Sequence, residues 1–100
     1  MVEVRPVPLR GGTAIGIEVE LPRTRLVAVA TERGYVMCGA LDVDVFNTRL
    51  AERRVLAGRA FGVRSIADLL AAPLADVTDA ARELGVTPGM TGQEALEHLL

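Results

Sequence analysis

This chain of 100 residues has no lysine, no tryptophan, only three aromatic residues, one cysteine and one histidine. Half of the residues are hydrophobic and few of these are aromatic, so the core must be built mainly from Val, Leu, Ile and Ala. The single cysteine, Cys38, excludes an intrachain disulfide and a metal site made of several cysteines. No apolar run approaches the roughly 20 residues that a membrane-spanning helix needs.

The chain also lacks an excess of positive charge. All eleven basic residues are arginine and thirteen residues are acidic, which gives a formal net charge of −2. Such a chain has no broad positive field, so we predict neither nucleic acid nor a membrane as a partner. The first residues lack the basic and then apolar segments of a signal peptide, which predicts a cytoplasmic protein.

The length is typical of one domain, and we predict a single domain over residues 1–100. A domain of this size buries only about 60–65% of its unfolded surface when it folds alone. A chain this rich in hydrophobic residues can bury the remainder against copies of itself, so we expect a homo-oligomer.

The first part of the chain shows two strand patterns. Val2–Val7 predicts a short strand interrupted by Pro6, and Pro6 and Pro8 restrict that strand to the edge of a sheet. From Thr13 to Leu21 apolar and other residues alternate, which predicts a strand with one buried face.

Two further strands follow. The continuous apolar run Leu26–Ala30 predicts a strand that is covered on both faces. Glu32–Gly34 predicts a tight hairpin with Gly34 at positive φ, and Tyr35–Gly39 predicts the returning strand. Together these segments indicate an antiparallel meander of three or four strands.

After Gly39 the hydrophobic period becomes helical, with Val43, Phe46 and Leu50 on one face. Acidic residues at the start and basic residues at the end both complement the helix dipole. These residues are Asp42 and Asp44 in the first turn, and Arg49, Arg53 and Arg54 in the last. Val55–Val63 predicts a second strand, which completes a strand–helix–strand unit.

The remainder is predicted to be helical. Ser65 caps a short helix that Pro73 ends, and a second helix stops at Gly85. Thr91 and Glu94 form a capping box before the last helix. The predicted fold class is therefore α+β, with an N-terminal antiparallel β-meander, then a strand–helix–strand crossover and C-terminal helices.

Three runs of the sequence carry a family likeness, namely Gly34–Asp42, Gly58–Arg64 and Gly89–Leu96. They resemble the YunC-like family, a bacterial and archaeal domain of unknown function (1805), in the same order and spacing from about Val7 to Leu100. The resemblance implies an α+β domain whose N-terminal strands, about residues 1–33 here, mediate oligomerisation as a tetramer. It implies no activity and assigns no catalytic residues, and the cofactors are unknown.

Cys38 is the first residue with candidate chemistry. It is expected at the end of a strand, beside Gly39 and just before the helix that begins near Asp42, where the helix dipole lowers the pKa of a thiol. Free cysteine is also among the most buried residue types. The single histidine, His98, is far along the chain, so a Cys–His pair needs a tertiary contact. Both interpretations stay open.

Arg59 is the second candidate, because it lies in a predicted strand among small residues where an unpaired charge is costly to bury. It therefore requires a carboxylate partner, a subunit interface or a bound anion, and Asp42 is the expected partner. Arg64 adds a second donor, which favours a phosphate or carboxylate site as much as an inter-subunit salt bridge. Asp42 and Asp44 point to different helix faces, so we predict no metal site.

The sequence leaves the function unknown and favours a non-enzymatic homo-oligomeric module that binds a small anionic metabolite or a protein partner. The candidate ligand-binding residues are Cys38, Gly39, Asp42, Arg59 and Arg64. One alternative is a small enzyme that uses Cys38 as nucleophile or redox thiol with Asp42 and Arg59. The other alternative is a purely structural subunit.

Overall fold

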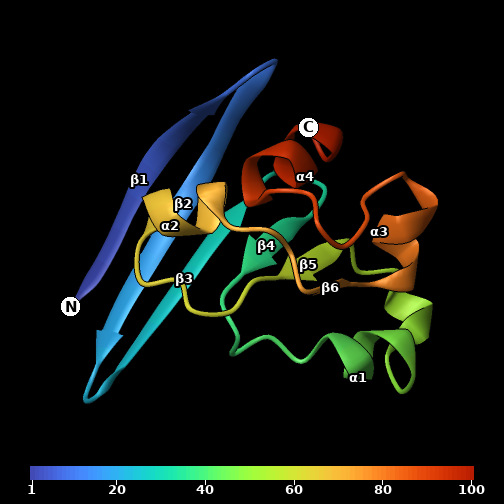
Figure 1. Cartoon of the computed structure of the whole chain (residues 1–100), viewed down its shortest axis with the longest axis horizontal. Coiled ribbons are helices and arrows are strands. Elements are labelled where there is room, and N and C mark those ends of the chain that lie inside the picture. Colours follow the sequence, from blue (N-terminus) through green and yellow to red (C-terminus); the bar gives the residue numbers. More distant parts are fainter.

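Three long antiparallel strands form the first part of the chain in the computed structural model, which describes residues 1–100 (Figure 1). They are β1 (Val2–Leu9), β2 (Gly12–Leu21) and β3 (Thr24–Ala30). Two-residue turns join them, and Gly11 and Arg23 in these turns adopt positive φ. The predicted N-terminal meander is confirmed.

The second half of the sheet contains its one parallel pair. β4 (Tyr35–Met37) continues the meander antiparallel to β3, and β5 (Ala57–Arg59) pairs with β4 in parallel. Between them lie α1 (Val43–Asn47) and the single 3₁₀ turn η1 (Ala51–Arg53), so the predicted strand–helix–strand unit is present. β6 (Asp76–Val77) completes the sheet in the order β1 to β6. This strand lies in the part of the chain that was predicted to be helical, so the prediction is wrong there, because these two residues pair with β5.

Three short helices follow β5, and each begins at a hydroxyl side chain that accepts a backbone N–H. They are α2 (Ile66–Ala71), α3 (Asp79–Glu83) and α4 (Gly92–His98), capped by Ser65, Thr78 and Thr91. In Figure 1, α2 and α4 lie against the same side of the β1–β3 ribbon. None of the helices has the length and hydrophobicity that crossing a membrane takes.

The core lies between this side of the sheet and the helices. Val27 and Val29 of β3 and Val36 of β4 are fully buried there, together with Leu69 of α2 and Leu96 of α4. These side chains are aliphatic and small, as the scarcity of aromatic residues requires.

Two prolines mark β1 as an edge strand without interrupting it. Met1 and Glu20 exchange both backbone hydrogen bonds, at 2.8 and 3.3 Å, and in an antiparallel pair such exchanges recur at every second residue. Pro6 and Pro8 occupy the alternate positions, where an N–H points away from β2. No bond to β2 is lost, so the strand continues through both prolines and the predicted interruption at Pro6 is wrong. The edge position predicted from the prolines is confirmed.

The helix predicted after Asp42 is shorter than expected, because α1 ends at Asn47. The Thr48 hydroxyl donates to the carbonyl of Asp44 at 2.8 Å, and Asn47 Oδ1 accepts the N–H of Asp79 at 2.7 Å. Such side-chain bonds to the backbone compete with helical hydrogen bonding. The prediction that Arg49, Arg53 and Arg54 form the last turn of this helix is therefore wrong, because all three follow the helix. The backbone of Arg54 adopts the left-handed conformation, with φ of 54°.

Two further details of the prediction are wrong. Gly34 does not have positive φ; glycine is required there because a Cβ would lie 2.3 Å from the carbonyl oxygen of Leu56. The strand predicted over Val55–Val63 covers only Ala57–Arg59, since the chain turns away at Gly62, where φ is +74°.

The capping box of α4 makes stability depend on pH. The Thr91 N–H donates to Glu94 Oε1 at 3.0 Å, and the Glu94 N–H donates to the Thr91 hydroxyl at 3.1 Å. The hydrogen bonds from Thr91 hold the pKa of Glu94 below its ordinary value. A depressed pKa means that the charged carboxylate stabilises the fold at neutral pH, and that this contribution disappears as the pH falls through the folded-state pKa.

We therefore expect Glu94→Gln to lower the Tm near pH 7, and the difference from wild type to shrink as the pH is lowered to about 3. Thermal melts followed by circular dichroism measure this difference. Glu32→Gln, at an exposed carboxylate outside any cap, is the control and leaves the Tm unchanged. A difference for Glu94→Gln that stays constant with pH would contradict the role assigned to its charge.

Candidate functional site

Arg59 joins three segments at the carboxyl ends of the parallel strands β4 and β5. Its Nε donates to Asp76 Oδ1 at 2.9 Å, and its Nη2 forms an ion pair with the other oxygen of this β6 carboxylate. Its Nη1 donates to the Leu41 carbonyl at 2.8 Å. The guanidinium lies over the ring of Phe61, 4.8 Å from the ring centre. Arg59 therefore ties β6, the loop before α1 and the loop after β5 together.

Asp76, and not the expected Asp42, is the carboxylate partner of Arg59. The hydrogen bond to Asp76 is the main cause that raises the pKa of Arg59 above its ordinary value, and the charge of Asp42 adds to it. Asp42 instead caps α1, where its Oδ1 accepts the N–H of Val45 at 3.1 Å. The requirement that the sequence set for Arg59 is thus met within the chain.

Phe61 is a residue of this corner that the sequence reasoning missed. Its side chain is 60% exposed, and its ring rests so closely on Gly39 that a Cβ there would lie 2.8 Å from the ring. The signal was present, because Phe61 stands between Ala60 and Gly62 in a chain with only two phenylalanines. We call Gly39, Arg59 and Phe61 the Phe61 corner.

Arg64 is not part of this corner. It lines a shallow pocket of about 520 Å³ on the helix side of the meander, together with Arg23 and Arg25. Three arginines in one pocket suggest an anion site, but Arg25 already lies 3.7 Å from Glu18 and 3.4 Å from Glu20.

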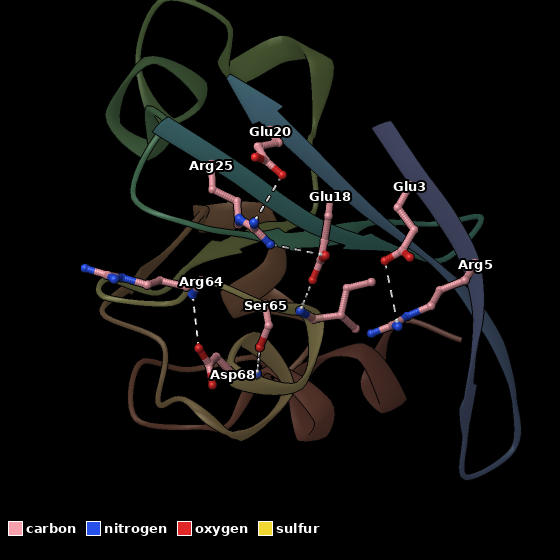
Figure 2. A network of polar contacts seen from close by, with 9 residues as sticks. Glu3, Arg5, Glu18, Glu20, Arg25, Arg64, Ser65 and Asp68 are labelled. Atoms are coloured by element: carbon pink, nitrogen blue, oxygen red, sulfur yellow. Dashed lines mark hydrogen bonds and ion pairs between the residues drawn. The ribbon is translucent and has the colours of Figure 1, made fainter. Parts of the chain in front are cut away.

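The same network anchors α2 on the sheet, as Figure 2 shows. Glu18 Oε1 accepts the N–H of Ile66 at 2.8 Å, and Ser65 Oγ accepts the N–H of Asp68 at 3.0 Å. Asp68 in turn accepts the N–H of Arg64 at 3.1 Å. Glu18 and Glu20 therefore both compensate Arg25, while Asp68 binds only the backbone of Arg64, and these contacts anchor α2 on the sheet.

Cys38 lies in the core, with 6% of its surface exposed. Its N–H donates to the Val27 carbonyl at 3.0 Å, which continues the pairing of β3 and β4. The one histidine, His98, is exposed on α4, with Nδ1 3.0 Å from the Glu94 carbonyl. The structure thus gives the thiol a packing role and does not provide the accessible position that a nucleophile needs.

The meander has a second face, away from α2 and α4, that carries no charge. The strand register places the following residues on it: Val2, Val4, Pro6, Pro8, Thr13, Ile15, Ile17, Val19, Leu21, Thr24, Leu26, Ala28 and Ala30. We call this set the uncharged face. Val2 and Val4 are 64% and 61% exposed, and Ile15 and Leu21 are each 45% exposed.

The charged residues of the same strands occupy the helix side. They are Glu3, Arg5, Glu18, Glu20 and Arg25. The prediction that Leu26–Ala30 is covered on both faces is wrong for the single chain, since Val27 and Val29 are buried while Leu26, Ala28 and Ala30 are half-exposed. A hollow of about 110 Å³ lies where β2, β3 and β4 meet, and its lining is entirely hydrophobic.

Comparison with known proteins places this geometry in a family. Residues 37–99 match the model of a domain of unknown function (DUF1805). The "Uncharacterized protein YunC" of Bacillus subtilis (strain 168) is 51% identical over 96 residues, which are 96% of this chain and 95% of that protein. The crystal structure of a protein of unknown function, TA1206 from Thermoplasma acidophilum, superposes on this chain with a TM-score of 0.89 at 23% sequence identity. The match covers 100% of this chain and 94% of the TA1206 chain. The predicted α+β fold is confirmed.

We expect Arg59→Met to lower the free energy of unfolding by about 1–2 kcal/mol. Hydrogen bonds to charged groups contribute about 1.5–3 kcal/mol each when buried, and solvent reduces this value here because Asp76 is 38% exposed. Urea unfolding measures the loss. Arg64→Met is the matched control, because the guanidinium of Arg64 makes no ion pair, and it changes stability by less than about 0.5 kcal/mol. Equal losses in both variants would refute the role given to Arg59.

We expect Cys38 in the native protein to react with an aromatic disulfide reagent at least about tenfold more slowly than glutathione at the same pH. The reason is its burial in the core. In guanidinium chloride the two thiols react at similar rates, which controls for the reagent. Native Cys38 reacting as fast as glutathione would restore the enzyme hypothesis.

Proposed function

Because this chain belongs to the family defined by the domain of unknown function DUF1805, we propose a function from its surface: a homo-oligomeric module that acts by binding and not by catalysis. The observation that carries the proposal is the uncharged face of β1–β3. In an antiparallel sheet with one side on the core, the other side normally carries polar residues. Here that side has no charged residue, and all of its residues but Thr13 and Thr24 are apolar.

The occupant of the uncharged face is a second copy of the chain. Contiguous exposed apolar surface marks an interaction site, whereas single exposed residues do not. A face without charge meets no like-charge repulsion from its own copy, so the same patch can pack on itself across a two-fold axis. The N-terminal strands, about residues 1–33, are therefore the oligomerisation region that we propose. The tetramer that the family resemblance implies, in a cytoplasmic protein, is part of the same proposal.

The free energy of association requires contact over the whole uncharged face, and not only over its four most exposed side chains. Complete burial of a Val, Leu or Ile side chain contributes about 1.5–3 kcal/mol, so covering the four most exposed ones adds roughly 1 kcal/mol each. Association costs an estimated 4–15 kcal/mol in lost translational and rotational freedom. The half-exposed residues of β2 and β3 must contribute as well, and the apolar hollow among them offers a place for a partner side chain.

The Phe61 corner supplies the binding part of the function. An exposed aromatic ring stacked on an arginine is typical of the residues that dominate protein interfaces. Asp76 and the Leu41 carbonyl already hold Arg59, and Arg64 lies elsewhere. The corner therefore favours a protein partner over a small anionic metabolite.

We expect wild-type protein to be oligomeric at micromolar concentration and Ile15→Asp to be a folded monomer. The reason is that a carboxylate on the uncharged face would be desolvated without a partner. Light scattering after size-exclusion chromatography gives the mass, and circular dichroism confirms folding. Leu84→Asp is the matched control, because Leu84 is 41% exposed and Ile15 is 45% exposed, but Leu84 lies at the end of α3.

Leu84→Asp is expected to keep the wild-type mass. A monomeric wild type, or an Ile15→Asp variant that stays assembled, would refute the homo-oligomer through this face.

A further inference from the structure

We propose that β1 pairs edge to edge with β1 of a second copy, antiparallel, with Glu3 opposite Glu3 of that copy. This pairing presupposes the homo-oligomer proposed above and adds a second contact to it. The contact is a backbone one at the open edge of the sheet, distinct from packing between the uncharged faces.

The open edge of β1 has two unlike halves. The residues that direct N–H and C=O groups away from β2 are Val2, Val4, Pro6 and Pro8, because Met1 exchanges its backbone bonds with Glu20. Val2 and Val4 each offer a donor and an acceptor. Pro6 and Pro8 offer acceptors only, so they close their half of the edge to pairing.

Pro6 also selects the register. In an antiparallel pair, the outward groups of one strand must meet outward groups of the other. If Val2 faces Val4 of the second copy, the two N–H donors and the two C=O acceptors of each strand all find partners. If Val4 faced Val4, Val2 would face Pro6 of the second copy, which has no N–H to donate. The first register places Glu3 at the two-fold axis.

Charge on the helix side is compatible with this register. Glu3 faces its own counterpart, which alone would repel. Arg5 lies 3.8 Å from Glu3 in the same chain, and Arg5 of the second copy takes the diagonal position, about 7–8 Å away and within reach of a long side chain. Two carboxylates thus lie between two guanidinium groups, and the net charge of the contact is zero.

Edge pairing and face packing fit together in one assembly. A two-fold axis perpendicular to the sheet keeps α2 and α4 of both copies on one side, so the two uncharged faces merge into one larger face. This larger face is free to pack on that of another pair. Two different self-complementary contacts per chain are what a closed tetramer needs.

A cysteine at the axis tests the register. Glu3→Cys places two thiols on residues that face each other in a non-hydrogen-bonded pair, with Cα atoms about 4.5 Å apart, which a disulfide can bridge. Arg5→Cys is the matched control on the same strand and face. Its two copies are four residues apart along the paired strands, about 13 Å, which is too far for a disulfide.

We expect mild oxidation to convert Glu3→Cys to a covalent dimer on non-reducing gels, at least about tenfold more completely than Arg5→Cys. Buried Cys38 is common to both variants and to the wild-type control. Adding Val4→Pro to Glu3→Cys removes an outward donor without touching the bonds to β2, and it is expected to abolish the crosslink.

Absence of the crosslink in a protein that light scattering shows to be assembled would overturn edge pairing while leaving the homo-oligomer in place. Equal crosslinking of Arg5→Cys would overturn the register. A wild-type protein that is monomeric would overturn both this pairing and the proposed function.

Discussion

The packing of α2 and α4 on one side of the β1–β3 meander is the constraint on which the rest of the structure depends. It buries Val27 and Val29 completely, and Glu18 adds a hydrogen bond to the first N–H of α2. Because side chains alternate along a strand, burial of one face directs the intervening residues outward. In this chain those residues are apolar, and the charged residues of the same strands lie on the helix side.

A second constraint acts where the chain changes from antiparallel to parallel pairing. Arg59 reaches β6, the loop before α1 and the ring of Phe61 from the end of β5. Its hydrogen bonds explain how a strand flanked by small residues holds an arginine whose side chain is only 22% exposed. They also hold the two loops whose residues form the Phe61 corner, so stability and the proposed binding surface depend on the same side chain.

These two constraints divide the molecule into surfaces with different chemistry. The meander offers an uncharged sheet face and an edge on which prolines block one half, and both features suit contact with an identical chain. The Phe61 corner, at the other end of the sheet, combines an aromatic ring with a compensated charge and suits a different protein. The proposed self-assembly would therefore leave this corner available.

The sequence by itself determined the order of β1 to β5 and of the helices, the edge position of β1 and the hydroxyl caps of α2 and α4, but not the short strand β6. Each of these features follows from local signals, namely hydrophobic period, proline and capping residues. The end of α1 at Asn47 was not predictable in this way, because a bond to Asp79 of α3 forms only in the folded chain.

Tertiary structure alone decided what the candidate residues do. Asp76 replaced Asp42 as the partner of Arg59 because β6 pairs with β5, a contact between segments 17 residues apart in sequence. Arg64 lies away from Arg59 because the chain turns at Gly62, and Cys38 is buried because the helices cover its side of the sheet. Ion-pair partners and burial depend on which distant segments meet, and local sequence patterns do not contain that information.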